Sequence, residues 1–168
     1  MSGGAITFRL ASPADRLILH QLFHETEIHY EGHNAPSHEL VAAHVDRDVI
    51  PALARCEILL AECDGAVAAM ASFGQLYPGP NLNGQIQVKD IFVRNGFRGR
   101  GIGPAIIRRL AAMALERRCT RVDWTAETSN PRALGFYDRL GVPRIQSKVC
   151  YRLDGDRLAA FAKAAKAD

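Results

Sequence analysis

The chain has 168 residues, of which 48% are hydrophobic and 23% are charged, and its formal net charge at pH 7 is +3. This balance is ordinary for one globular domain, so we expect a single domain over residues 1–168. The net charge is too small to predict a nucleic-acid partner, and no apolar run reaches the ~20 residues of a membrane span. Because the start of the chain lacks the apolar core of a signal peptide, a cytoplasmic protein without nucleic-acid or membrane partners is expected.

The first third of the chain is predicted to form one strand and two helices. Residues 5–10 alternate between apolar and polar side chains, as a strand does. The sequence Ser12-Pro-Ala-Asp15 then supplies an N-cap, a proline and an acidic residue, in the order that starts a helix. This helix is expected to reach residues 27–29, and Ser37 caps a second helix that ends near Pro51. The side chains of the second helix expected to face inward are Leu40, Val41, Val45 and Val49.

A hairpin and a loop follow the helices. Residues 57–63 and 66–75 are apolar runs that Asp64-Gly65 joins, and this dipeptide is typical of a two-residue β-turn. Residues 77–84 form a loop longer than a hairpin needs. Such loops often border substrate sites.

The stretch from Gln85 to Gly103 is predicted to pass from a strand into a helix. Its β-branched and aromatic run ends at Val93, and the apolar residues after Pro104 recur at helical spacing. The proline suits the first turn of a helix, where a missing N–H group costs no hydrogen bond.

The glycines of this stretch predict an anion site. Gly99, Gly101 and Gly103 let the backbone take left-handed angles and let a ligand approach closely. Free N–H groups at the positive end of a helix, with Arg98 and Arg100 beside them, are suited to a pyrophosphate. The spacing fits neither a Rossmann turn nor a Walker loop. The plain alternative is a strand-to-helix turn, which needs fewer glycines and no arginines.

The remaining elements complete an α/β pattern. We expect a strand over residues 120–126, a helix over 131–140 that Gly141 ends, a last strand over 144–153 and a tail helix from Asp156. Antiparallel strands thus come first and βαβ units follow. This order predicts a central mixed sheet with helices on both faces.

Two motifs in this half of the chain resemble one known family. Arg98-x-x-Gly101-x-Gly103 resembles the pyrophosphate loop (Q/R-x-x-G-x-G/A) of the GCN5-related N-acetyltransferase (GNAT) family. Downstream, Asn130 follows a strand, and Tyr137 lies in a helix end that is similar to the family's F-Y-x-x-L-G. The two motifs lie within residues 85–142.

The resemblance implies the GNAT fold and direct transfer of an acetyl group from acetyl-CoA to an amine in a ternary complex. It implies a strand N–H near Phe92 or Val93 that stabilises the oxyanion, and Tyr137 as the acid that protonates the departing thiolate. A core aromatic is the plain alternative for this tyrosine. The implied cofactor-binding residues are Ile91, Phe92, Val93, Arg98, Gly99, Arg100, Gly101, Ile102, Gly103, Asn130 and Tyr137.

The family often uses a carboxylate as the base that deprotonates the amine, and several carboxylates are candidates here. Asp90 lies on the central strand and Glu127 follows the next one. Three more lie near the first helix: Glu25, Glu27 and Glu31. Strand alternation is expected to separate Asp90 from Lys89, on opposite faces of the strand. For each carboxylate taken alone, a solvated or structural ion pair is the plain alternative.

The nearest group within the family is that of the spermidine/spermine and thialysine N-acetyltransferases. The chain resembles this group in Glu27-Ile-His-Tyr30-Glu31 and in Asp90-Ile-Phe-Val93, and by this resemblance Glu27, Tyr30 and Glu31 are expected to bind the amine. The chain departs from the group at Lys89, where a Glu is typical. A lysine that faced the site would repel a polycation, so a small primary amine, an amino-acid side chain and an antibiotic amine all stay open.

The histidines and cysteines predict no metal site. His20/His24 and His29/His33 have the spacing of helical zinc ligands, but surface or substrate-lining histidines are the expected reading. The four cysteines form no C-x-x-C pair and are expected to be small buried hydrophobes in a reducing compartment: Cys56, Cys63, Cys119 and Cys150.

Other functions remain open for the same residues. An acyl-CoA sensor would keep the glycine loop without turnover, and a protein lysine or N-terminal acetyltransferase would take a peptide in place of a small amine. A nucleotide-binding domain of another type would bind ATP or NAD. The last strand and the tail helix are expected to help build a homodimer, as in many relatives of the family.

Overall fold

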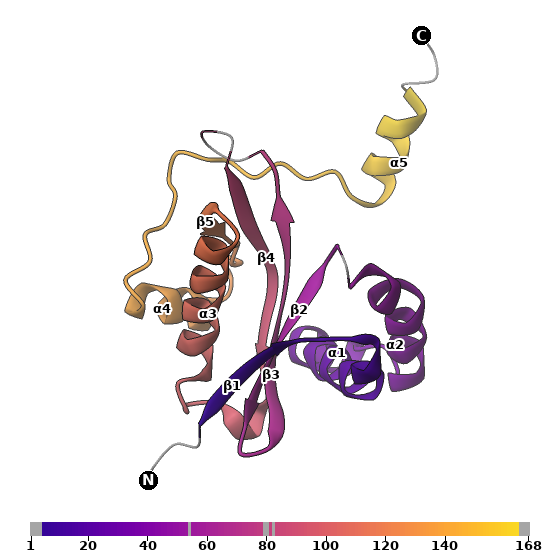
Figure 1. The fold of residues 1–168 in the computed structure, drawn as a ribbon. Helices are drawn as coiled ribbons and strands as arrows, with labels where there is room; N and C mark the ends of the chain where they lie inside the picture. The colour runs from indigo at the N-terminus through magenta and orange to yellow at the C-terminus, as the bar shows by residue number, and fades with distance from the viewer. Residues whose placement is uncertain (1–4, 54, 79–80, 82, 165–168) are drawn as a thin grey trace. The chain divides into compact units, whose positions relative to one another are not determined.

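The computed structural model describes residues 5–53, 55–78, 81 and 83–164 (Figure 1). These residues fall into two compact units, Met1–Ala126 and Glu127–Asp168, which are described separately below. The single domain expected from the length stays a prediction. None of the described helices is long and apolar enough to cross a membrane.

The first unit contains a five-stranded sheet in the order β1-β2-β3-β4-β5. Neighbouring strands are antiparallel from β1 to β4, and β5 is parallel to β4. The mixed sheet expected from the sequence is thus confirmed. The strands are β1 (Ile6–Leu10), β2 (Glu57–Cys63), β3 (Ala66–Leu76), β4 (Gly84–Val93) and β5 (Cys119–Asp123).

The hairpin between β2 and β3 forms where the sequence predicts it. Asp64 and Gly65 have φ angles of 54° and 75°, so both central residues of the turn are left-handed. Two such residues make the turn whose twist matches that of the flanking strands.

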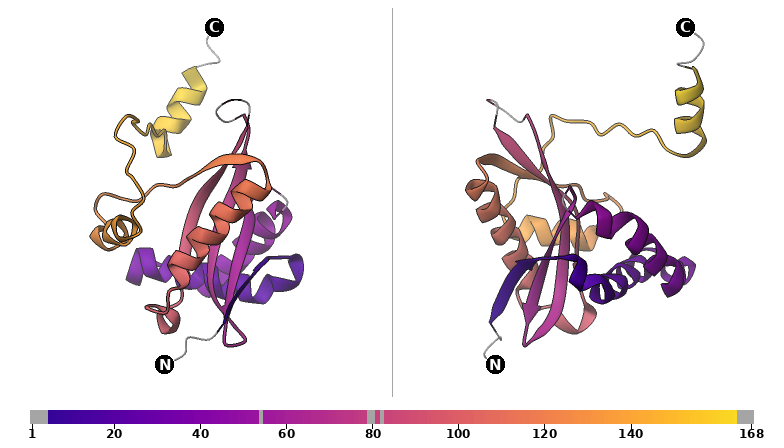
Figure 2. Two further views of the ribbon diagram at one scale, coloured as in Figure 1. Left: turned by 60° about the vertical axis from the view of Figure 1, so that its left-hand side comes forward. Right: turned by 45° about the vertical axis from the view of Figure 1, so that its right-hand side comes forward.

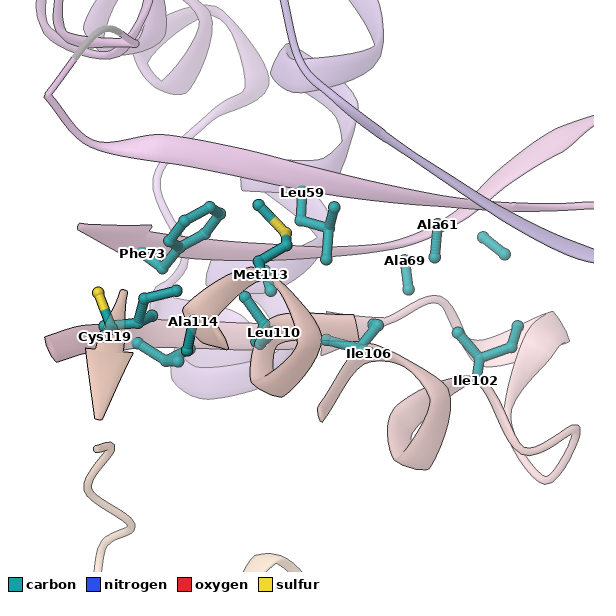
Figure 3. Packing of buried hydrophobic residues seen from close by; sticks show 14 of the residues in the cluster. Leu59, Ala61, Ala69, Phe73, Ile102, Ile106, Leu110, Met113, Ala114 and Cys119 are labelled. Atoms are coloured by element: carbon teal, nitrogen blue, oxygen red, sulfur yellow. The ribbon is translucent and has the colours of Figure 1, made fainter. Parts of the chain in front are cut away.

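Helices cover both faces of this sheet. Figure 2 shows α3 (Ile102–Glu116) on one face, and α1 (Arg16–Glu31) with α2 (His38–His44) on the other. Figure 3 shows side chains of α3 directed at the sheet, and the buried ones recur at helical spacing: Ile102, Ile106, Leu110, Met113 and Ala114. They pack against Phe73 of β3 and Ile86 of β4. A second buried cluster joins α1 and α2 to the other face through Leu19, Leu22, Met70 and Phe92.

The start of α1 is held by the residues that the sequence marks as a cap. The carboxylate of Asp15 accepts a hydrogen bond from the N–H of Ser12 at 2.8 Å and pairs with the Arg9 guanidinium at 2.7 Å. Because the arginine stabilises the charged form, the pKa of Asp15 falls from 3.8 to about 2. The helix runs to Glu31, slightly beyond the expected end, and Gly32 follows with a φ of 57°.

The second helix is shorter than expected and changes type. Ser37 accepts a hydrogen bond from the N–H of Leu40, as predicted for its cap. After α2 the chain continues through a π-helical turn (Val45–Val49) and a 3-10 turn (Ile50–Ala52). Val41 and Val45 are buried, but Leu40 is 51% exposed, so its expected inward position is wrong. Consecutive helical residues point about 100° apart, which turns Leu40 outward when Val41 faces the core.

The second unit contains two helices, α4 (Pro131–Arg139) and α5 (Gly155–Ala164). Gly141 has a φ of 71° and ends α4, as predicted. The strand expected over residues 144–153 is wrong, because this segment has no strand conformation. Its apolar side chains are exposed, and alternation makes a strand only where a neighbouring strand supplies hydrogen bonds. Those side chains include Ile145, Val149, Tyr151 and Leu153.

The cysteines divide into two kinds. Cys63 and Cys119 are buried, as expected, whereas Cys56 and Cys150 are exposed, and all four are free thiols. The expectation of burial was wrong for Cys56 because it precedes β2, and for Cys150 because its strand does not form.

Candidate functional site

The C-terminal part of β4 has one open backbone edge. Pairing between β4 and β5 ends where Gln87 meets Asp123, but β4 continues to Val93. On its other edge β4 stays paired with β3 as far as Val93, opposite Ala69. The strand residues expected to contact the cofactor, which are Ile91, Phe92 and Val93, therefore lie where β4 and β5 have parted. An extended ligand with amide groups can hydrogen-bond to such an edge.

The backbone conformation of the loop after β4 requires glycine at two positions. Gly99 and Gly101 have φ angles of 78° and 77°. A Cβ on either would meet no atom within 4 Å, so the backbone conformation and not the space demands glycine. Gly103 differs, because it lies in the first turn of α3 and its φ is not left-handed.

The loop leads directly into the N-terminus of α3. Gly101 is the N-cap and accepts a hydrogen bond from the N–H of Ala105 at 3.1 Å. The N–H groups of Ile102 and Gly103 precede the first intrahelical donor, and Pro104 has none to lose. The positive end of the helix dipole adds to them, which suits a phosphate group.

Both arginines of the loop hold it against the rest of the unit. The Arg98 Nε donates to the Val93 carbonyl at 2.9 Å, and its guanidinium lies 6.0 Å from the centre of the Phe92 ring. Arg100 pairs with Asp64 of the β2–β3 turn at 3.1 Å, and both side chains are about half exposed. The two cations therefore lie beside the loop, as the sequence predicts.

Two adjoining hollows open on the α1–α2 side of the first unit, the larger among α1, α2 and their connections and the smaller between these segments and the sheet. The larger, of about 360 Å³, is lined by residues of α1 and α2 and of the turn after them, including Glu27 and His44. The smaller, of about 200 Å³, reaches β4 and is lined by Cys56, Ser72, Lys89 and Asp90 among others. They share three lining residues, Phe23, Asp48 and Val49.

A β-bulge brings Lys89 and Asp90 to the same side of β4. Asp90 is opposite Ser72 and Val88 is opposite Phe73, so β4 has one extra residue between them. Val88 and Ile91 both pack on the α3 side, which breaks the two-residue alternation. The predicted separation of Lys89 from Asp90 is wrong, because both line the smaller hollow.

The carboxylates near α1 have different surroundings. Glu27 lines the larger hollow, whereas Glu31 is an exposed residue at the end of α1. Glu25 pairs with Arg94 after β4, with both carboxylate oxygens within 3.1 Å of Nε. Because this pair ties α1 to the end of β4, Glu25 has a structural role, the plain alternative that the sequence left open.

Two side chains, those of Tyr30 and Cys56, lie close enough to Asp90 for its charge to act on them. Burial, with the Asp90 charge as the next cause, raises the pKa of Tyr30. Although Cys56 is exposed as a residue, partial desolvation of its thiol, followed by the charges of Asp90 and Glu57, raises the pKa of the thiol. The His29 ring lies 6.0 Å from that of Phe92, two residues along the strand. Tyr30 and Cys56 are therefore protonated at neutral pH.

The second unit holds the other predicted residues. The Asn130 side chain accepts a hydrogen bond from the N–H of Ala133 at 3.0 Å and so caps α4. Tyr137 lies on this helix, partly buried, with its ring 5.0 Å from that of Phe136. Glu127 is exposed in the segment before α4.

The histidine pair on α1 serves a structural contact. His20 is 8% exposed, and its Nε2 lies 2.8 Å from Asp46 Oδ1. Of the two positions expected for it, surface or substrate-lining, the surface position is wrong for His20. Its contact joins α1 to the turn after α2. Across the described residues, no group of three His, Cys, Asp or Glu side chains is arranged to hold a metal ion.

The comparisons with known proteins agree on the family. The model of the acetyltransferase (GNAT) family matches residues 19–142. An L-ornithine N5-acetyltransferase of Arabidopsis thaliana is 30% identical over 100 residues, which are 60% of this chain and 44% of that protein. A thialysine N-epsilon-acetyltransferase of Bos taurus is 31% identical over 80 residues, which are 46% of this chain and 47% of that protein. The chain thus spans about half the length of the curated relatives it matches.

A solved structure matches more of the chain. It is an integron cassette protein from the mobile metagenome of V. cholerae, with 33% identity and a TM-score of 0.88, and the match covers 94% of this chain and 98% of that one. This likeness confirms the fold class predicted from the order of elements.

Proposed function

Because the chain belongs to the acetyltransferase (GNAT) family, we propose that it transfers an acetyl group from acetyl-CoA to a primary amine of a small molecule. The observation that carries the proposal is the open edge of β4 beyond Gln87, followed at once by the glycine loop and the N-terminus of α3. In CoA, an extended pantetheine arm is joined to a pyrophosphate. The open edge of β4 suits the arm, and the glycine loop with the N-terminus of α3 suits the pyrophosphate.

The first step of the proposed function is the binding of acetyl-CoA. The backbone of Ile91, Phe92 and Val93 pairs with the amides of the pantetheine arm. The pyrophosphate is held by the residues from Arg98 to Gly103, with the N–H groups of Ile102 and Gly103 pointing at it. By the family resemblance, Asn130 and Tyr137 are also proposed to contact the arm.

The hollows on the α1–α2 side supply the acceptor site. In this proposal the ammonium group of the acceptor binds at the smaller hollow, which Asp90 and Asp48 border, and Glu27 of the larger hollow extends the site. Tyr30, near the end of α1, is the further residue expected to contact the amine. The pKa of Asp48 is held below its usual range by the guanidinium of Arg47, so Asp48 is ionised at neutral pH. Glu31 belongs to the outer rim of this site.

Transfer takes place directly between the two bound substrates. Asp90 removes a proton from the ammonium, the amine nitrogen attacks the thioester carbon, and an N–H of the strand near Phe92 or Val93 stabilises the oxyanion. The carbon–sulfur bond then breaks, and Tyr137 protonates the departing CoA thiolate. The nitrogen gives up its second proton, which restores the Tyr137 phenol through water, and Asp90 returns its proton to solvent. Glu127 is the alternative base. No cysteine or serine has to form a covalent intermediate in this scheme.

We further propose a homodimer in the cytoplasm. The exposed apolar side chains of residues 144–153 and of α5, Phe161 among them, suit a contact with a second copy. Free thiols at Cys56 and Cys150 are typical of a reducing compartment. A gel-filtration mass near that of one chain would contradict the dimer.

The experiment that tests the function is release of free thiol from acetyl-CoA. The native chain and Tyr137→Phe are assayed against polyamines, amino acids, thialysine, aminoglycosides and lysine peptides. The proposal predicts turnover with one class of small amine and a loss of about 100-fold or more in kcat for Tyr137→Phe. Turnover with peptides alone indicates a protein acetyltransferase. CoA binding without turnover on any amine indicates a sensor, and stabilisation by ATP or NAD but not CoA contradicts the proposal.

A further inference from the structure

Almost all of the surface that lines the smaller hollow is apolar, although Asp90 borders it. The apolar side chains come from α1, from the turns after α2 and from β2, and they include Phe23, Val49, Ala52 and Ile58. Water makes few hydrogen bonds at such a surface, so a hydrocarbon group that takes its place there is stabilised by the hydrophobic effect. The lining therefore favours an apolar group next to Asp90.

The larger hollow continues this apolar lining. Phe23 and Val49 line both hollows, and the larger one adds Pro36, Val41 and Val45. Its volume of about 360 Å³ lies within the range of small-molecule sites, which is ~300–1,000 Å³. The α1–α2 side of the unit thus has room for more than a methyl or ethyl group.

The charges at the smaller hollow suit one ammonium group. Asp48 already pairs with Arg47 at 2.6 Å, and both side chains are more than half exposed. Among the described residues, Asp90 forms an ion pair with no lysine, arginine or histidine side chain. Asp90 is thus the carboxylate of this hollow that lacks a protein cation. Glu27 of the larger hollow also lacks one, so a diamine is the rival acceptor that the test has to exclude.

We propose that the acceptor is a primary amine with one ammonium group and an apolar body, such as an alkyl chain or an aromatic ring. This inference rests on the proposed function, because it concerns the acceptor of that reaction. The reacting nitrogen lies at Asp90, on the strand that also carries the proposed oxyanion donor, and the apolar body covers Phe23, Val49 and Ala52. A second charged group on the acceptor would lose its water against these side chains, which costs free energy.

The test is a series of amines in which only the body changes. Ethylamine, butylamine and hexylamine lengthen the chain, and phenethylamine carries an aromatic ring. At the length of hexylamine, 1,6-diaminohexane ends in a second ammonium and 6-aminohexanoate ends in a carboxylate. We expect kcat/KM, measured by thiol release, to rise about 3-fold for each added methylene group, because each one is removed from water. Hexylamine is expected to exceed both charged analogues about 10-fold or more in kcat/KM.

Two variants tie this preference to the hollows. Val49→Thr replaces a methyl group by a hydroxyl of similar size at a residue that lines both hollows. At native CoA affinity, it is expected to lower kcat/KM about 5-fold more for hexylamine than for ethylamine. Val67→Thr is the matched control, because Val67 is a partly buried valine of the same apolar cluster that lines neither hollow. Ala52→Leu fills the smaller hollow and is expected to weaken hexylamine more than ethylamine.

Three results overturn the inference and leave the proposed function standing. The first is a kcat/KM that does not rise from ethylamine to hexylamine, or turnover confined to the polar amines of the panel above. The second is a preference for either charged analogue over hexylamine. The third is an equal loss with hexylamine and ethylamine in Val49→Thr, or the same loss in Val67→Thr. Absence of turnover with every amine of the series and of the panel, despite CoA binding, overturns the proposed function itself, and this inference with it.

Discussion

The two faces of β4 carry different kinds of residue. Towards α3, the strand contributes Ile86, Val88, Ile91 and Val93 to an apolar core, and the proposed cofactor contacts are backbone groups of the open edge and the glycine loop. Towards α1 and α2, Lys89 and Asp90 of the strand border a hollow. A cofactor common to a family can be bound by the backbone, whereas an acceptor particular to one protein needs side chains.

The two faces of β4 are also expected to respond differently to substitutions. The conformation of the glycine loop depends on φ angles that other residues rarely adopt, so changes there are expected to act on the cofactor alone. The smaller hollow is lined by residues of α1, of the turns after α2 and of β2, β3 and β4, and changes there are expected to act on the acceptor. The following substitutions test whether the two sides are independent.

The largest effect is expected from Asp90→Asn. Loss of the proposed base lowers kcat by about 100-fold or more, whereas CoA affinity stays at the native value because the α3 side is unchanged. Thiol release and calorimetric titration with CoA measure the two quantities. Glu39→Gln, which removes an exposed carboxylate of α2 outside both hollows, serves as the control. An equal loss of CoA affinity in Asp90→Asn would show that the two sides are not separate.

The next effect is expected from Gly101→Val. A β-branched residue at a φ of 77° distorts the loop, and we expect CoA affinity to fall about 10-fold or more with KM for the amine unchanged. Gly96→Val is the matched control, because a Cβ at Gly96 also meets no atom within 4 Å and its φ is not left-handed. Equal losses in the two variants would mean that bulk, and not conformation, matters in this loop.

A smaller effect is expected at Cys56, which reports on the hollow. Since burial and the charge of Asp90 raise its pKa, the thiol is protonated at neutral pH and should react slowly with an alkylating reagent, then faster as the pH rises. In a Cys150→Ser chain, the acceptor amine should slow this reaction, and Asp90→Asn should speed it at a fixed pH by removing a nearby negative charge. Labelling rates by mass spectrometry check this. Insensitivity to the amine would place the acceptor elsewhere.

The smallest effect is expected from Asp15→Asn, at the start of α1. The pKa of Asp15 is lowered from 3.8 to about 2, so its ion pair stabilises the fold at pH values above about 4, and this contribution is lost as the pH falls through about 2. We expect the variant to be less stable by about 1 kcal/mol at pH 7 and to approach the stability of the native chain only below about pH 2. Urea unfolding at several pH values measures the difference. A constant difference across this range would contradict the pKa shift.

The features that the sequence predicts well are set by neighbouring residues. The turn at Asp64-Gly65, the cap at Ser12 and the left-handed Gly99 and Gly101 depend on the conformations that a few adjacent residues allow. The glycine-loop motif of the family is predicted well for the same reason, because it describes a local backbone conformation. These elements could be located without knowledge of the sheet.

The features that the sequence misses depend on distant partners. No pattern marks the bulge at Lys89, and so strand alternation gave this lysine the wrong face. Asp48 and Ser72 line the hollow only because a π-helical turn and β3 meet there, and no spacing in the sequence links them. The strand predicted over residues 144–153 is wrong for a related reason. Alternating apolar residues suit a strand, but a strand also needs a neighbouring strand as its hydrogen-bond partner, and the local sequence does not show whether one is present.

The most direct test of the central claim is hydrogen–deuterium exchange of the whole chain with and without CoA. If the open edge of β4 and the start of α3 bind the cofactor, CoA slows exchange of the amides in residues 88–93 and 99–103. The amides of α1 and α2 are expected to change little until an amine is added. Binding of CoA that protects α1 and α2 but leaves residues 88–93 and 99–103 unchanged would contradict the claim.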